Sequence, residues 1–224
     1  NPAYLAAYQG FLERQPHLRC GVAIGTELDD LEDEAIRNAD DFPTPDSVDA
    51  ALGLHMIYFA SDVARSLRAI LRFLKPGGVF FSVVTDEATA YSGSVFRSFA
   101  ESGGDTGRNE HDFAAMDERR RLLAPESEGG GGLVEAVAAA GIGVEVEAVR
   151  QPSRMYGHSL ADLLALSNIS VLTTHPGTLK FECAAKALRD RPEEVDFRIE
   201  TDGPRMGMWS VVQPQWVTQV RRVR

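Results

Sequence analysis

Residue types and patterns that are rare in this sequence exclude several kinds of protein. Only two of its 224 residues are cysteine, Cys20 and Cys183, and their wide separation suits no metal site. We therefore expect reduced thiols in a cytoplasmic protein without a bound metal. No hydrophobic run approaches the length of a membrane span, and no signal-peptide pattern opens the chain, so we expect no membrane contact.

Basic side chains are also in short supply. There are 23 Lys and Arg against 33 Asp and Glu, which gives a net charge of −10. Because nucleic-acid binding depends on neutralising phosphates with Lys and Arg, this balance argues against a nucleic-acid partner. It is compatible with a cationic small-molecule substrate, although acidic solubility alone explains it as well.

The clearest structural pattern is a strand, a helix and a second strand in the first half of the chain. Residues 48–54 form an almost unbroken apolar run, typical of a strand buried on both faces. A helix follows, which Ser61 or Asp62 can cap, and the Pro-Gly-Gly sequence at 76–78 predicts its sharp end. Residues 79–84 predict the second strand. Such a sequence of elements predicts a right-handed βαβ unit with parallel strands.

The remaining chain alternates between helical and extended patterns. The polar segment at 86–113 is too long for a simple turn and predicts a lid or binding loop. The glycines within 126–132 predict a flexible linker, and the final arginines predict a solvated tail. Further helices are expected at 2–14, 133–140, 159–175 and 180–188, and further strands at 18–24, 142–149, 195–201 and 208–214.

Several segments resemble a known family. "HMIYF" after the first strand and "LKPGG" before the second resemble a class I S-adenosylmethionine-dependent methyltransferase. "NPAYLAAYQGFLE" at the start, "YSG" after the second strand and "SLADLLALSNIS" near the end are similar to its histamine N-methyltransferase-like branch. The resemblance implies an α/β fold: a Rossmann-like sheet with helices on both faces and an antiparallel C-terminal strand pair. It also implies methyl transfer from S-adenosylmethionine to a small-molecule amine.

One family motif has no counterpart in this sequence. Members of the family carry a Gly-rich turn, E/D-x-G-x-G-x-G, and a later acidic residue for the ribose, whereas the only Gly-rich stretch here is Gly129–Gly132. We therefore expect a single, partial methyltransferase domain over residues 1–224, a truncated sequence without its N-terminal strands. Strand 48–54 would then be a bare edge where a partner or a second copy binds. A variant fold whose gap a partner fills is the alternative, and weak cofactor binding is expected.

The resemblance also implies site residues. His55, at the carboxyl end of the first strand, is the candidate catalytic residue, because a histidine there can accept an amine proton. The cofactor would be contacted by Tyr4, Thr26, Ala51, Leu52 and Gly53. An aromatic wall for the amine would be formed by Tyr58, Tyr91 and Tyr156. Each of these also has a structural interpretation, such as core packing for the tyrosines.

Two other functions stay open at this point. One is a non-catalytic, methyltransferase-like remnant that serves as a protein-interaction module. The other is an O-methyltransferase of the same fold. The sequence does not identify the methyl acceptor or the oligomeric state.

Overall fold

The computed structural model describes residues 10–11, 14–15, 28–33, 42–102, 106–167 and 181–223. The strand expected at 18–24 and nearly all of the helix expected at 2–14 lie outside these residues, as do Tyr4 and Thr26. Four short 3-10 turns accompany the larger elements: η1 (Leu28–Asp30), η2 (Ile57–Phe59), η3 (Glu126–Glu128) and η4 (Gly203–Arg205).

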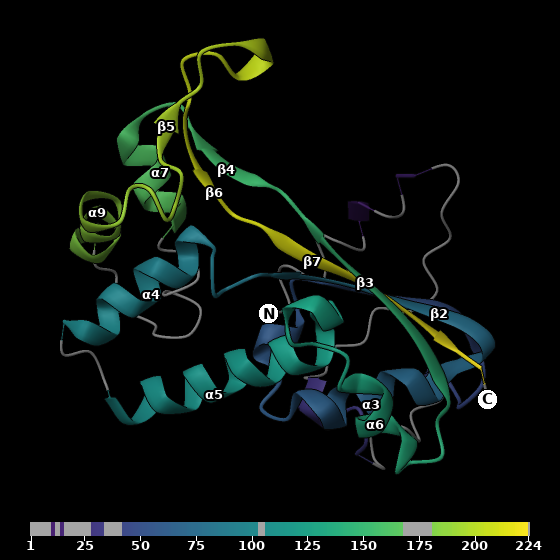
Figure 1. Ribbon diagram of the computed structural model, residues 1–224. Helices are drawn as coiled ribbons and strands as arrows, with labels where there is room; N and C mark the ends of the chain where they lie inside the picture. The colour runs from purple at the N-terminus through teal and green to yellow at the C-terminus, as the bar shows by residue number, and fades with distance from the viewer. Residues whose placement is uncertain are drawn as a thin grey trace.

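A four-stranded mixed sheet forms the body of the protein (Figure 1). Strand β2 pairs in parallel with β1 and antiparallel with β7, and β7 also pairs antiparallel with β3. Helix α3 (Val63–Phe73) joins β1 to β2, as the βαβ prediction requires. The strands, in their order across the sheet, are β1 (Val48–Leu54), β2 (Leu74–Thr85), β7 (Gln215–Arg222) and β3 (Val144–Gln151). This arrangement confirms the predicted α/β fold class.

The two ends of α3 follow from its sequence. Asp62 caps the helix by accepting a hydrogen bond from the backbone nitrogen of Arg65 at 2.9 Å. At the other end β2 starts at once, because Leu74 already pairs with Val48. Ala50 pairs next with Val79, so the Lys-Pro-Gly-Gly segment bulges out of the ladder. The predicted turn is therefore present, but inside the strand rather than before it.

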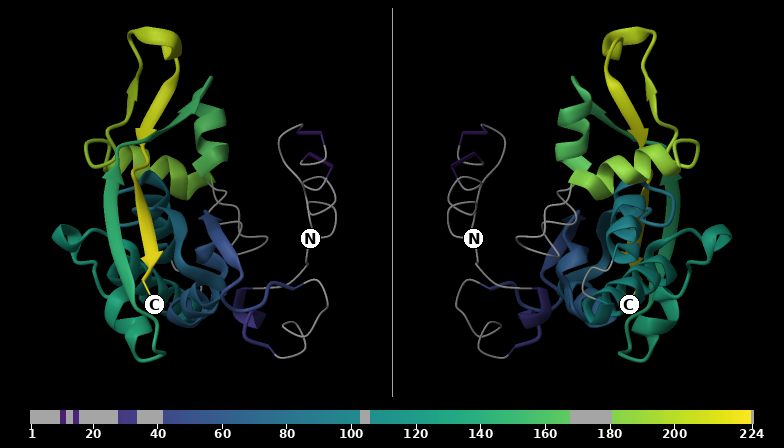
Figure 2. Two further views of the ribbon diagram at one scale, coloured as in Figure 1. Left: turned by 90° about the vertical axis from the view of Figure 1, so that its right-hand side faces the viewer. Right: turned by 90° about the vertical axis from the view of Figure 1, so that its left-hand side faces the viewer.

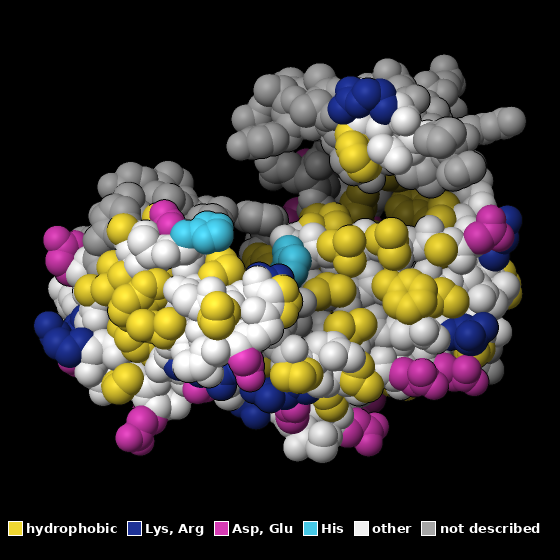
Figure 3. All heavy atoms as spheres, turned by 90° about the horizontal axis from the view of Figure 1, so that it is seen from above, with side chains coloured by type: hydrophobic (Ala, Val, Ile, Leu, Met, Phe, Trp, Pro, Cys, Tyr) yellow, Lys and Arg dark blue, Asp and Glu magenta, His cyan; other side chains and the backbone are white. Residues whose placement is uncertain are grey.

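The faces of the sheet differ in their cover. One packs against α3, α5 (Thr106–Leu123) and α6 (Leu133–Ala138), which together form the core of the body. On the other face, which we call the open face, the side chains of Leu52, Leu54 and Phe81 are 65%, 57% and 36% exposed. Figure 3 looks down on this face and shows apolar side chains gathered over it. The prediction that strand 48–54 is buried on both faces is thus wrong for the described part of the chain, because helices cover one face only.

A second unit, which we call the cap, stands at the carboxyl ends of β1 and β2 (Figures 1 and 2). Its three-stranded sheet has the order β4-β6-β5, and Tyr91, Phe99, Leu163 and Val211 lie in its core. Strands β3 and β6 lead into and out of the cap through Pro152 and Pro214. Its elements are β4 (Arg154–Gly157), β5 (Arg198–Ile199), β6 (Trp209–Val212), α4 (Tyr91–Glu101), α7 (Leu160–Ser167) and α9 (Phe181–Asp190).

The polar segment after β2 is helical, which corrects the predicted lid or binding loop. It forms α4 and the first part of α5. The serines of α4 are buried, and they have partners: Ser92 and Gln213 exchange two hydrogen bonds, of 3.3 and 2.8 Å. A Cβ at Gly93 would lie 1.8 Å from the carbonyl oxygen of Glu87, so only glycine lets α4 pack this closely. The polar composition of this segment led to the wrong prediction of a loop, because small polar residues can fill a core when they are hydrogen bonded.

Residues 126–132 form a compact turn between α5 and α6, unlike the flexible linker predicted. The backbone nitrogen of Gly130 donates to the Pro125 oxygen at 3.0 Å, and that of Gly132 to the Arg121 oxygen at 2.9 Å. Gly129 and Gly131 take φ angles of 86° and 90°, which other residues rarely adopt. The glycines therefore serve a tight turn.

Arg221 and Arg222 lie in β7 instead of a solvated tail, and Arg224 lies outside the described residues. The Arg222 guanidinium donates from Nη1 to the carbonyl oxygens of Leu71 (3.3 Å), Arg72 (3.1 Å) and Leu74, where α3 ends. It also forms an ion pair with Asp46. A cation is favourable at the C-terminus of a helix, where carbonyl groups lack helical partners.

Arg222→Met should lower the free energy of unfolding by about 1–3 kcal/mol, because it removes these charge-assisted hydrogen bonds. Arg221→Met is the matched control: its side chain is exposed on the same strand, and a surface substitution changes stability by about 0.5 kcal/mol or less. Urea unfolding followed by circular dichroism measures both. Equal losses in the two variants would contradict the capping role.

Candidate functional site

The candidate site lies where β1 and β2 end, the edge at which open α/β sheets bind ligands. We call it the edge site and define it by His55, Tyr58, Glu87, Arg119 and Gln215. His55 directly follows β1, and its backbone nitrogen donates to the Val83 oxygen at 2.9 Å. Its φ of 53° is in the left-handed region. A residue other than glycine seldom adopts this conformation, and such strain often accompanies a functional position.

The imidazole of His55 lies between two polar side chains. Its Nδ1 is 3.4 Å from the hydroxyl of Tyr58, and its Nε2 is 3.5 Å from Nε2 of Gln215, the first residue of β7. The rings of His55 and Tyr58 are stacked at an interplanar angle of 17°. Burial lowers the pKa of His55 below its ordinary value of 6.5. The ring is therefore neutral at neutral pH and able to accept a proton.

Tyr58 is fixed from two sides. Its hydroxyl oxygen accepts a hydrogen bond from the backbone nitrogen of Thr85, the last residue of β2. The guanidinium carbon of Arg119 lies 5.3 Å from the centre of its ring, a cation–π contact. Burial raises the pKa of Tyr58, so its hydroxyl stays protonated over the neutral range.

Two ion pairs lie behind these residues. Arg119 Nε and Nη2 donate to the same carboxylate oxygen of Glu87 at 3.0 and 2.8 Å, with side chains only 7% and 22% exposed. Beside them Arg150 of β3 donates to the buried carboxylate of Asp86 at 3.0 Å. Removing one partner of such a pair would leave an uncompensated charge, so both pairs are firm parts of the edge. Both carboxylates are thus already paired with an arginine.

The structure separates the three tyrosines that were predicted to form one wall. Tyr58 lies at the edge site. Tyr91 is fully buried in the core of the cap, where its hydroxyl donates to the Ala184 oxygen at 2.8 Å. This corrects its predicted contact with substrate. Tyr156 lies in β4 under the guanidinium of Arg205, 4.0 Å from the ring centre. The tyrosines thus belong to separate environments.

The strand residues predicted to contact the cofactor also have other surroundings. A Cβ at Gly53 would lie 2.8 Å from the Phe80 ring, so this glycine accommodates a side chain of the neighbouring strand. Ala51 packs against the core of the body, and Leu52 lies on the open face. None of these three side chains presents a polar group to a ligand.

Sequence reasoning missed most of the polar residues at the edge site. Glu87 and Arg119 stand 32 positions apart, and Gln215 follows His55 by 160, so no local spacing connects them. The charged pair Asp86 and Glu87 at the end of β2 was the one available signal. Arg119 and Gln215 could be found only from the packing of α5 and the position of β7.

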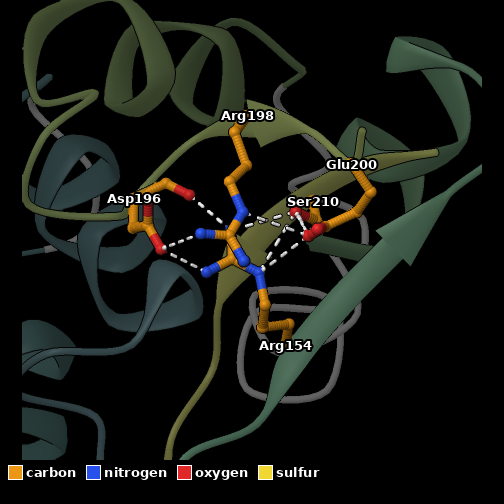
Figure 4. A network of polar contacts seen from close by, with 5 residues as sticks. All are labelled: Arg154, Asp196, Arg198, Glu200 and Ser210. Carbon is orange, nitrogen blue, oxygen red and sulfur yellow. Dashed lines mark hydrogen bonds and ion pairs between the residues drawn. The ribbon is translucent and has the colours of Figure 1, made fainter. Parts of the chain in front are cut away.

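A further polar network lies in the cap (Figure 4). Arg154 Nε and Nη2 donate to the hydroxyl of Ser210 at 3.1 and 2.9 Å, and its guanidinium also pairs with Asp196 and Glu200. Arg198 pairs with the same two carboxylates. Charges therefore balance within this network, which ties β4, β5 and β6 together.

Searches for other kinds of site gave negative results within the described ranges. No group of His, Cys, Asp or Glu there could hold a metal ion. None of the described helices combines the length and hydrophobicity that crossing a bilayer would need. The described residues also do not by themselves form a cradle for S-adenosylmethionine, since Gly53 is packed and the nearby carboxylates are paired.

Comparisons with known proteins support one enzyme class. Residues 26–82, about a quarter of the chain, match a family described as a methyltransferase domain. A search of curated proteins found no match. The matched residues include β1, α3 and most of β2, and S-adenosylmethionine-dependent methyl transfer is the activity that this match supports.

Solved structures give a weaker likeness. A Bacillus halodurans protein assigned as a methyltransferase aligns with 99% of this chain and 79% of its own, at 13% identity and a TM-score of 0.49. A protein from Galdieria sulphuraria assigned as a sarcosine dimethylglycine methyltransferase aligns with 80% of this chain and 54% of its own, at 14% identity and a TM-score of 0.31. These values concern the fold and do not identify the substrate.

The lowered pKa of His55 makes a testable prediction about stability. Between its folded pKa and about 6.5, the unfolded chain binds more protons at this histidine than the folded protein does. The free energy of unfolding should therefore fall as the pH drops below about 6.5, and this contribution should be absent in His55→Gln. Urea unfolding of both proteins from pH 7.5 to 5 measures it. A stability difference that does not change with pH would contradict the prediction.

Proposed function

We propose that this protein transfers a methyl group from S-adenosylmethionine to the nitrogen of a small-molecule amine, with the edge site on the acceptor side. The observation that carries the proposal is the neutral, partly accessible imidazole of His55 at the carboxyl end of β1. The methyltransferase match over residues 26–82 includes this position. The cofactor supplies an activated methyl group when bound.

Methyl transfer to an amine needs the protein mainly to position the amine and to remove a proton from it. An alkylamine is mostly protonated in neutral water, and a protonated nitrogen has no lone pair with which to attack. His55 would accept that proton at Nε2, the ring nitrogen that faces Gln215. The imidazolium would then return the proton to water. Holding the amine in line with the methyl group would supply much of the remaining rate enhancement.

Contacts with the cofactor form a separate part of this proposal. Tyr4 and Thr26 remain predictions, since both lie outside the described residues. Ala51 and Leu52 stay candidates only through their backbone, at the strand end that such a ligand approaches. The weak binding expected from the missing Gly-rich turn also stays a prediction.

A second function has one observation in its favour. The open face of the sheet carries the apolar row Leu54, Val83, Val217 and Val149, which are neighbours across all four strands. Exposed apolar patches often mark interaction sites. A non-catalytic protein-interaction module would bind its partner through this face, and the edge site would have no catalytic role.

The test combines cofactor binding with turnover. Calorimetric titration of S-adenosylhomocysteine measures binding, and mass spectrometry with a panel of primary and secondary amines measures methylation. His55→Gln should lower kcat by about 100-fold or more and leave binding of S-adenosylhomocysteine unchanged, because a general base contributes about 10²–10⁴ in rate.

His158→Gln is the matched control, since His158 is exposed on the cap and should not affect turnover. Equal kcat in His55→Gln and the unmodified protein would reject His55 as the base. Absence of both binding and turnover would favour the interaction module.

A further inference from the structure

We propose that Tyr58 is a positioning residue for His55: it keeps the imidazole proton on Nδ1 and so makes Nε2, which faces Gln215 at the edge site, the ring nitrogen that accepts a proton. The Arg119–Glu87 ion pair holds Tyr58 in place for this task. The inference rests on the proposed function, because it explains how His55 stays ready to accept a proton. It gives Tyr58 a role different from the substrate contact predicted from sequence.

The contact with Gln215 indicates which ring nitrogen carries the proton. Nε2 of Gln215 lies 3.5 Å from Nε2 of His55, and an amide NH2 group can only donate. With the amide in this orientation, the Nε2 atom of His55 accepts. A neutral imidazole has a single proton, so that proton is on Nδ1.

Tyr58 provides the matching acceptor. Its hydroxyl oxygen lies 3.4 Å from Nδ1 of His55 and has two acceptor lone pairs. One accepts from the backbone nitrogen of Thr85, which leaves the second for the Nδ1 proton. Such hydrogen bonds to the second ring nitrogen are a general means of fixing a histidine tautomer.

The position of Tyr58 depends in turn on a rigid set of contacts. Arg119 covers one face of its ring, and Glu87 holds both the Nε and the Nη2 of Arg119. The backbone of Glu87 is confined by α4, which packs against it at Gly93. The ring of Tyr58 therefore cannot turn away from His55 without losing its cation–π contact with Arg119 and its hydrogen bond from Thr85.

The experiment reads the tautomer directly. Long-range ¹H–¹⁵N spectra of the ligand-free protein distinguish protonated from unprotonated ring nitrogens, and His55→Gln assigns the signals. We expect the unmodified protein to show a protonated Nδ1 and an unprotonated Nε2. In Tyr58→Phe, which keeps the ring but loses the oxygen, the two nitrogens should shift toward averaged values. Its kcat should fall about tenfold, with little change in KM.

Variants at Arg119 test whether its contact with the Tyr58 ring holds Tyr58 in position. Arg119→Met should shift the His55 signals in the same direction as Tyr58→Phe, and Arg119→Lys should restore part of the change, because an ammonium also binds an aromatic face. Two matched controls should leave the His55 signals unchanged. Tyr156→Phe alters a tyrosine under an arginine in the cap, and Arg121→Met breaks the Arg121–Glu118 ion pair on the same helix.

The outcomes separate this inference from the proposed function. A proton on Nε2 in the unmodified protein, or an unchanged spectrum in Tyr58→Phe, would overturn the positioning role. Urea unfolding shows which variants are folded, and Tyr58→Phe carries the test if Arg119→Met is not. The expected tautomer without methylation of any amine would support the positioning role and reject the proposed function.

Discussion

The pairing of β7 between β2 and β3 is the constraint on which the rest of the structure depends. Its ladder with β2 runs from Val79–Arg221 to Thr85–Gln215, and its ladder with β3 is one pair longer. Trp216, Thr218 and Val220 point into the core of the body, so this register also fixes the helical layer. Because β7 begins where the cap ends, its first residue lies at the edge site.

The charged side chains at the edge site are already paired with one another in the absence of a ligand. Glu87 and Asp86 both follow β2, and each is held by an arginine from another element, Arg119 of α5 or Arg150 of β3. A buried carboxylate without such a partner would be costly and would attract the amine to the wrong place. With both engaged, the neutral imidazole of His55 is the group at this edge that is suited to exchange a proton.

Much of the body could be predicted from sequence because the patterns that specify its helices and turns lie within a few residues of each other. The capping aspartate, the apolar spacing of α3 and the Pro-Gly-Gly turn act within a few residues, and they gave the βαβ unit. The reciprocal cap of α7 is equally local: Ser159 and Asp162 exchange backbone hydrogen bonds of 3.0 and 3.1 Å. His55 was identified for the same reason, as the residue directly after an apolar strand.

What could not be predicted depends on contacts between distant segments. The serines of α4 look like loop residues until Gln213 is placed beside them, and Arg222 looks like a tail until β7 enters the sheet. The role of Tyr58 follows the same logic. Its sequence neighbours suggest an aromatic surface for a ligand, whereas Thr85 and Arg119 give it a fixed hydroxyl and a covered ring. A tyrosine held in this way is better suited to orient His55 than to adapt to a substrate, because rotation of its side chain would break a hydrogen bond and a cation–π contact together.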